Sequence, residues 1–177
     1  GEATVIAWLW VRTVTCPNPA CGAQMPLASK WWLSKKKGKE AWVELLIDHT
    51  TARPKIHFTV VTGKGKPQEG TVNRQGARCI ACGSSVAFDY IRSEGKTGQM
   101  KVQLTAIVAE GERGRAYLSP DEKQVTTAVQ VLTSGVPETD LPEQALGFRV
   151  QLYGMTKHRD LFAPRQLVAL TRFSDLV

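Results

Sequence analysis

Short apolar runs separated by glycine-rich or basic turns dominate the first half of the chain, a pattern typical of β-structure. Residues 5–14 are apolar on both faces, which predicts a buried strand or helical turn leading to the first cysteine. Residues 30–33, 41–47 and 55–62 are predicted to form a β-meander, and the last of these alternates and is rich in β-branched side chains. Residues 63–76 hold four glycines and a proline, so we expect a loop there.

A further strand and a hairpin are predicted in the second half of the chain. Residues 86–92 combine apolar and aromatic side chains, which favours a strand. Residues 103–109 and 115–118 should pair with each other across a turn at residues 110–114.

Helical patterns appear toward the C-terminus. Residues 121–132 predict a helix with Ser119 as its N-cap and Pro120 in its first turn. A polar, proline-bearing connector is expected over residues 133–142, and a strand over residues 147–153.

The last segment, residues 164–177, gives the clearest helical pattern, because Pro164 stands at its start and apolar residues share one face. These residues are Leu167, Val168, Leu170 and Leu176. We therefore expect an α+β fold in which strands dominate.

The composition is that of a globular protein, with 42% hydrophobic and 22% charged residues in 177. No apolar run reaches the roughly 18 residues of a membrane span, and no basic segment precedes the apolar start, so we expect a cytoplasmic protein without membrane contact. Gly1 in place of Met and a helix that continues to the last residue predict a fragment of a longer chain; a tag scar would also explain Gly1.

The formal net charge of +7 favours a polyanionic partner. The basic residues that precede the second cysteine pair are candidates for phosphate contacts with DNA: Lys64, Lys66, Arg74 and Arg78. A second basic run lies at Lys35, Lys36, Lys37 and Lys39. The alternative for both groups is a solvated turn that keeps edge strands from pairing.

The four cysteines form two pairs that each end in Cys-Gly. Residues 16–22 read C-P-N-P-A-C-G and residues 79–83 read C-I-A-C-G. Two thiolates within one tight turn can point at a common metal ion, and Gly22 and Gly83 give the backbone the freedom to bend there. We call residues 16–22 the first knuckle and residues 79–83 the second knuckle.

Two disulfides, a thioredoxin-like redox pair and free thiols are the alternatives. Nothing in the sequence indicates secretion, the redox motif expects one pair within a βαβ unit, and two Cys-Gly pairs are not expected of free thiols. We therefore predict one structural zinc ion on Cys16, Cys21, Cys79 and Cys82, with no open position for catalysis. Because 57 residues separate Cys21 from Cys79, the predicted zinc ribbon carries a large β insertion.

The expected organisation is a single zinc-ribbon unit over residues 1–177. The β insertion occupies residues 23–78, and residues 84–177 supply the hairpin, a helix and the C-terminal strand and helix.

No catalytic constellation is evident in the sequence. His49, His57 and His158 are scattered, and the glycine-rich segment 65–71 lacks the lysine of a phosphate-binding loop. Trp31 and Trp32 are adjacent, so one of them should face outward in a strand, where it is available to stack on a base.

Three stretches resemble prokaryotic adenine-specific DNA methylases that contain a zinc ribbon: V-I-A-W-L-W-V-R-T-V-T-C-P-N-P-A-C-G-A-Q-M-P-L, T-G-K-G-K-P-Q-E-G-T-V-N-R-Q-G-A-R-C-I-A-C-G and F-A-P-R-Q-L-V-A-L-T-R-F-S-D-L-V. The resemblance implies transfer of a methyl group from S-adenosylmethionine to adenine in DNA, often within restriction systems. It also implies that this chain is the insert between the cofactor motif and the catalytic Asp-Pro-Pro-Tyr, since neither is present here.

The resemblance therefore carries over the four cysteines and no catalytic or cofactor-binding residue, so S-adenosylmethionine would bind only the parent enzyme. The expected partners are DNA and the rest of the methylase chain. A free-standing zinc module that docks on protein, and a purely structural brace for the methylase, are the alternatives.

Overall fold

The computed structural model describes residues 3–111, 114–131, 134–143 and 149–176. The chain divides into two compact units. The first comprises Gly1–Ile91 and Gln99–Pro120, and the second comprises Arg92–Gly98 and Asp121–Val177. Helix α1 (Phe88–Lys96) begins in the first unit and ends in the second.

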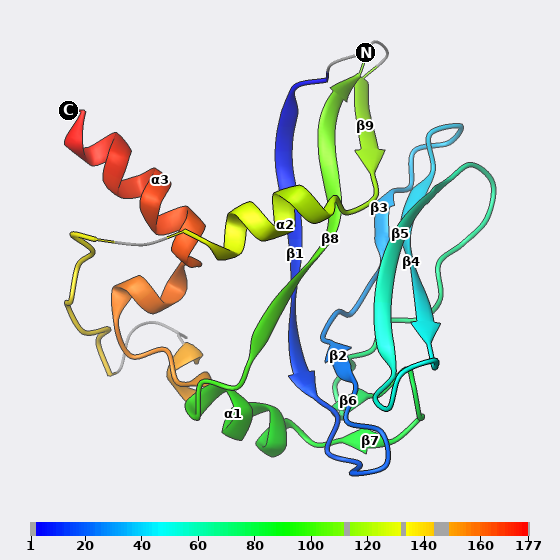
Figure 1. Ribbon diagram of the computed structural model, residues 1–177, viewed down its shortest axis with the longest axis horizontal. Helices are drawn as coiled ribbons and strands as arrows, with labels where there is room; N and C mark the ends of the chain where they lie inside the picture. Colours follow the sequence, from blue (N-terminus) through cyan, green and yellow to red (C-terminus); the bar gives the residue numbers. More distant parts are fainter. Residues whose placement is uncertain (1–2, 112–113, 132–133, 144–148, 177) are drawn as a thin grey trace. The chain divides into compact units, whose positions relative to one another are not determined.

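The first unit is built from antiparallel strands (Figure 1). Its sheets have the orders β2-β1-β8-β9, β3-β4-β5 and β6-β7. The strands are β1 (Val5–Thr15), β2 (Gln24–Pro26), β3 (Trp32–Ser34), β4 (Ala41–Asp48), β5 (Lys55–Thr62), β6 (Ala77–Arg78), β7 (Ser85–Val86), β8 (Lys101–Gly111) and β9 (Gly114–Leu118).

The predicted meander and hairpin are confirmed. Strand β4 pairs with β3 and β5, and the basic turn lies between β3 and β4. Strands β8 and β9 pair up to Gly111 and Gly114, while Glu112 and Arg113 of the predicted turn lie outside the described residues. The strand-rich part of the expected α+β fold is therefore present.

The core of the first unit lies where β5 packs on β8 and β9. Strand β8 buries six consecutive residues, 104–109, as expected of a strand that is covered on both faces. The largest buried residues include Met25, Trp31, Trp42 and Ile107. Strand β1 is less buried than its sequence predicts, since Ile6 is 51% and Trp8 49% exposed.

The strand predicted at residues 86–92 is wrong, because the chain there forms α1. Only Ser85–Val86 is extended. Ile91 is the buried residue of α1, while Asp89 in its first turn and Lys96 in its last turn suit the helix dipole. The Tyr90 hydroxyl donates a hydrogen bond of 2.9 Å to the carbonyl oxygen of Thr15, immediately before the first knuckle.

Among its described residues, the second unit contains helices, the connecting segment 134–143 and an isolated β-bridge between Asp140 and Lys157. Besides the end of α1 it holds α2 (Glu122–Val129), the 3-10 helices η1 (Val150–Tyr153) and η2 (His158–Leu161), and α3 (Pro164–Asp175). The strand predicted at residues 147–153 is wrong, since its described part is mainly η1; residues 147 and 148 lie outside the described residues. A turn held by the backbone N–H of Gly154 outweighs the β propensity of that segment.

The predicted N-cap of α2 is also wrong. Asp121 caps the helix, accepting a hydrogen bond of 3.0 Å from the backbone N–H of Gln124. The Ser119 hydroxyl instead accepts one of 2.9 Å from the backbone N–H of Val60 on β5. Leu132, the predicted end of this helix, lies outside the described residues.

Helix α3 is confirmed, with Pro164 in its first turn. Its apolar face is only partly covered, because Leu167 is buried whereas Leu170, Phe173 and Leu176 are 48%, 70% and 83% exposed. Within the described ranges, no helix combines the length and hydropathy needed to cross a bilayer.

Candidate metal centre

Each knuckle is closed by a backbone hydrogen bond of the same type. The N–H of Cys16 donates to the carbonyl oxygen of Ala23 over 2.8 Å, and the N–H of Cys79 donates to that of Ser84 over 2.9 Å. In each case the acceptor is the residue after the terminal glycine, so each turn folds back on its first cysteine.

The two terminal glycines adopt the left-handed conformation, which is consistent with the backbone bend that the sequence predicted after each cysteine pair. The φ angles of Gly22 and Gly83 are +57° and +77°. A side chain is strained in this region, so glycine is the residue that lets each knuckle bend without cost.

The four cysteine sulfur atoms converge, all lying within 4.8 Å of one another. The Sγ atoms of Cys16 and Cys82 are 3.7 Å apart, and those of Cys21 and Cys79 are 3.9 Å apart. Four thiolates at about 2.3 Å from a tetrahedral ion would be separated by about 3.8 Å. All four cysteines are free, and the closest pairs join opposite knuckles. The cluster could therefore hold a metal ion.

The protein environment of the sulfurs is uneven. Cys16, Cys21 and Cys79 are buried, whereas Cys82 is exposed. Burial raises the pKa of the Cys16 and Cys79 thiols. The Ser84 hydroxyl and backbone N–H lower the pKa of Cys82 to about 6. A metal would consequently displace protons from the buried thiols when it binds.

Asn18 and Ser84 connect the two knuckles, and the sequence analysis missed both. The Asn18 side-chain amide donates to Cys82 Sγ over 3.8 Å and to the Ser84 hydroxyl over 3.3 Å. Its carbonyl oxygen accepts from the backbone N–H of Ala20 over 3.0 Å. Such contacts orient metal ligands, and the only signal in the sequence was that a polar residue stands inside or just after each knuckle.

Backbone contacts outside the knuckles bring the two cysteine pairs together. The N–H groups of Thr71 and Val72 donate to the carbonyl oxygen of Ala28 over 2.8 and 3.2 Å. The Thr71 hydroxyl accepts from the backbone N–H of Ala28 and donates to the carbonyl oxygen of Pro26. The N–H of Arg78 donates to the carbonyl oxygen of Thr71. This bond positions the next residue, Cys79, at the cluster.

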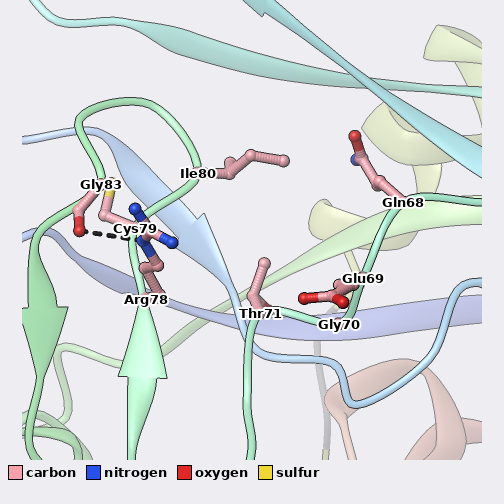
Figure 2. A pocket seen from close by; sticks show the side chains of 8 residues that line it. All are labelled: Gln68, Glu69, Gly70, Thr71, Arg78, Cys79, Ile80 and Gly83. Atoms are coloured by element: carbon pink, nitrogen blue, oxygen red, sulfur yellow. Dashed lines mark hydrogen bonds between the residues drawn. The ribbon is translucent and has the colours of Figure 1, made fainter.

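A small pocket lies beside the second knuckle, with a volume of about 280 Å³ (Figure 2). The residues that line it come from the second knuckle and the loop before it: Gln68, Glu69, Gly70, Thr71, Arg78, Cys79, Ile80 and Gly83.

The predicted DNA-binding residues Lys64, Lys66, Arg74 and Arg78 are all exposed. Of the four, Arg78 lines the pocket, where its Nε donates to the carbonyl oxygen of Gly83 over 3.1 Å. The three histidines are exposed, with His49 in the loop after β4, His57 on β5 and His158 on η2, so the structure does not gather them into a site.

The adjacent tryptophans differ as the sequence predicted. Trp31 is buried, and Trp32 is partly exposed. Trp32 packs edge-on against Trp42 with ring centroids 5.8 Å apart, and Lys35 Nζ lies 5.6 Å from its ring.

Comparison with models of known protein families, with curated proteins and with solved structures found no match.

Proposed function

We propose that Cys16, Cys21, Cys79 and Cys82 bind one structural zinc ion as the two knuckles of a zinc ribbon. The spacing of the four sulfurs supports this assignment, since it matches a tetrahedral thiolate site. Thiolate ligands favour zinc over hard cations such as Mg²⁺. Four protein ligands leave no position for water, so the ion stabilises the fold rather than activating a substrate.

Our proposal for the whole protein is that this chain is the zinc-ribbon segment of an adenine-specific DNA methyltransferase, in which it contributes to DNA binding or to structural support of the enzyme. The single observation that carries it is the convergence of two Cys-Gly knuckles from stretches that resemble that family. Methyl transfer and S-adenosylmethionine binding would belong to other parts of the enzyme.

The DNA contact would be made by exposed basic residues near the second knuckle. Lys64, Lys66, Arg74 and Arg78 lie on or beside the loop that leads into it, and all four are exposed. Each phosphate that such a side chain neutralises releases counterions, which makes affinity fall with salt.

The second candidate function is a zinc-stabilised module that docks on protein. Leu170 and Phe173 on α3 and Leu176 at its C-cap favour it, because they recur every third residue and remain exposed. Exposed apolar surface of this kind is a common feature of protein interfaces.

The test combines metal analysis with DNA binding. Purified protein should contain one zinc per chain, and its affinity for a labelled duplex should fall as salt rises. Replacing Lys64, Lys66 and Arg74 with Ala should make the slope of log affinity against log salt shallower by up to about 2.7.

A matched control removes the same charge elsewhere, through Lys101→Ala, Lys123→Ala and Arg172→Ala, at three exposed positions. An equal loss in both triple variants would refute the loop as the DNA contact. A zinc-loaded protein without DNA affinity at low salt would favour the docking module. Methyl transfer to adenine is then assayed with the product of the complete reading frame, with and without Cys79→Ser.

A further inference from the structure

The pocket beside the second knuckle is distinct from the metal site. Of the four cysteines only Cys79 contributes to its lining, and Cys79 is itself fully buried. Its walls are the second knuckle, with Arg78 and Ile80, and the loop that holds Gln68 and Glu69 (Figure 2).

The loop wall of the pocket is fixed in place. A Cβ atom on Gly70 would lie 2.2 Å from the carbonyl oxygen of Ser29, so these two backbone segments are in direct contact. The Trp31 indole N–H donates to the carbonyl oxygen of Glu69 over 3.2 Å. Thr71, at the base of the pocket, is buried. Its hydroxyl accepts a hydrogen bond from the backbone N–H of Ala28 and donates one to the carbonyl oxygen of Pro26. The pocket is thus formed before any ligand binds, as small-molecule sites usually are.

The charged groups of the pocket retain hydrogen-bonding capacity that a ligand could use. The bond from Arg78 Nε to Gly83 fixes the guanidinium, and within the described part of the chain no hydrogen bond or ion pair engages its terminal nitrogens. The Glu69 carboxylate likewise has no ion pair among the described residues. Arg78 and Glu69 lie on opposite sides of Thr71, and the apolar Ile80 side chain extends across the space toward Gln68 (Figure 2).

A ligand that fits must offer acceptors to Arg78, donors to Glu69 and a flat apolar face to Ile80. Guanine does so: O6 and N7 accept from an arginine fork, while N1–H and the N2 amino group donate to a carboxylate. Adenine presents a donor where guanine has O6. A phosphate group would suit Arg78 but would be repelled by Glu69.

We propose that this pocket binds a guanine base, held by Arg78 and Glu69 next to the metal centre. This inference rests on the nucleic-acid binding proposed above, and it assigns Arg78 to a base rather than to a phosphate. The base would be unstacked or single-stranded, because the carboxylate contact uses the edge that pairs with cytosine.

The test is a titration of the zinc-loaded, ¹⁵N-labelled protein followed by NMR, with 5′-GMP, 5′-AMP and inorganic phosphate as separate probes. GMP should shift the signals of Arg78 Nε–H, Ile80 and Gly83 at concentrations where AMP and phosphate do not. Equal shifts with phosphate, equal shifts with AMP, or no shift with any probe would overturn the proposal.

Two substitutions separate the contacts. Arg78→Lys keeps the charge but loses the planar fork, and Glu69→Gln keeps the shape but loses the charge; each should weaken GMP binding about 5- to 150-fold. Arg115→Lys, at an exposed position on β9 outside the pocket, is the matched control and should bind GMP as the unchanged protein does. Glu69→Gln with unaltered GMP binding and improved phosphate binding would identify an anion site instead.

The zinc content and melting temperature of each variant report whether the knuckle remains folded, so a loss of GMP binding in an unfolded variant does not count as support. Failure of this inference also stays distinct from failure of the proposed function. Salt-dependent duplex binding with no GMP response would refute the pocket alone, whereas GMP binding without DNA affinity would refute the DNA-binding role alone.

Discussion

Removing the metal should destabilise the first unit strongly, and Cys79→Ser is the sharpest way to do so. Cys79 is fully buried, and its Sγ lies 3.9 Å from that of Cys21. A serine hydroxyl is a poor substitute for a thiolate on zinc, so the variant should lose the ion.

The size of the effect follows from the coupling of metal binding to folding. Structural zinc sites bind with about 10–16 kcal/mol, comparable to the whole stability of a typical domain at about 5–15 kcal/mol. The Cys79→Ser variant should lose only part of this free energy, because the β1–β8 and β4–β5 pairings do not depend on the knuckles. A loss of about 5 kcal/mol would lower the melting temperature by about 10–20 °C for a chain of this length.

The assay is thermal unfolding followed by circular dichroism, with zinc measured on the same samples. Ser85→Ala, at an exposed position beside the second knuckle, is the matched control and should retain both zinc and melting temperature. A Cys79→Ser protein that is free of metal yet melts within about 2 °C of the unchanged protein would refute a structural role for the ion.

Three further predictions concern the same region. Thr71→Val removes a buried hydroxyl with two backbone partners and should cost about 2–4 kcal/mol in urea unfolding; a cost below about 0.5 kcal/mol would contradict it. Gly70→Ala would place a Cβ 2.2 Å from the carbonyl oxygen of Ser29, so it should lower the melting temperature and abolish the GMP response, and unchanged values of both would argue against the contact. Metal binding requires thiolates, and burial raises the pKa of Cys16 and Cys79, so zinc affinity in competition with a chelator should fall as pH falls, by about tenfold per pH unit for each proton released; an affinity independent of pH would disprove this linkage.

The sequence predicted the elements whose local pattern and tertiary role agree. Strand β5 was predicted with its observed bounds, Lys55–Thr62, because alternation and β-branched residues suit its half-buried position. The convergence of the cysteines was also predictable, since two Cys-Gly turns are a local feature that depends little on the rest of the fold.

The errors occur where a short segment is decided by contacts distant in sequence. Residues 88–92 carry side chains that suit a strand, but burial of Ile91 and the bond from Tyr90 to Thr15 favour a helix. Ser119 follows the rule for an N-cap, yet β5 uses its hydroxyl. No pattern in the sequence placed Asn18 against Cys82, because that contact joins positions 64 residues apart only after both knuckles form.

The long insertion between the knuckles is compatible with a ribbon because it is folded and returns to its starting point. Closing a flexible loop of 57 residues rather than about 20 would cost only about 0.9 kcal/mol more. The bonds between Thr71 and Ala28 close that loop through the protein itself, before any metal binds. The ion would therefore stabilise a meeting point that the chain already defines. The same returning loop places Glu69 opposite the second knuckle, so the insertion that lengthens the ribbon also builds the pocket.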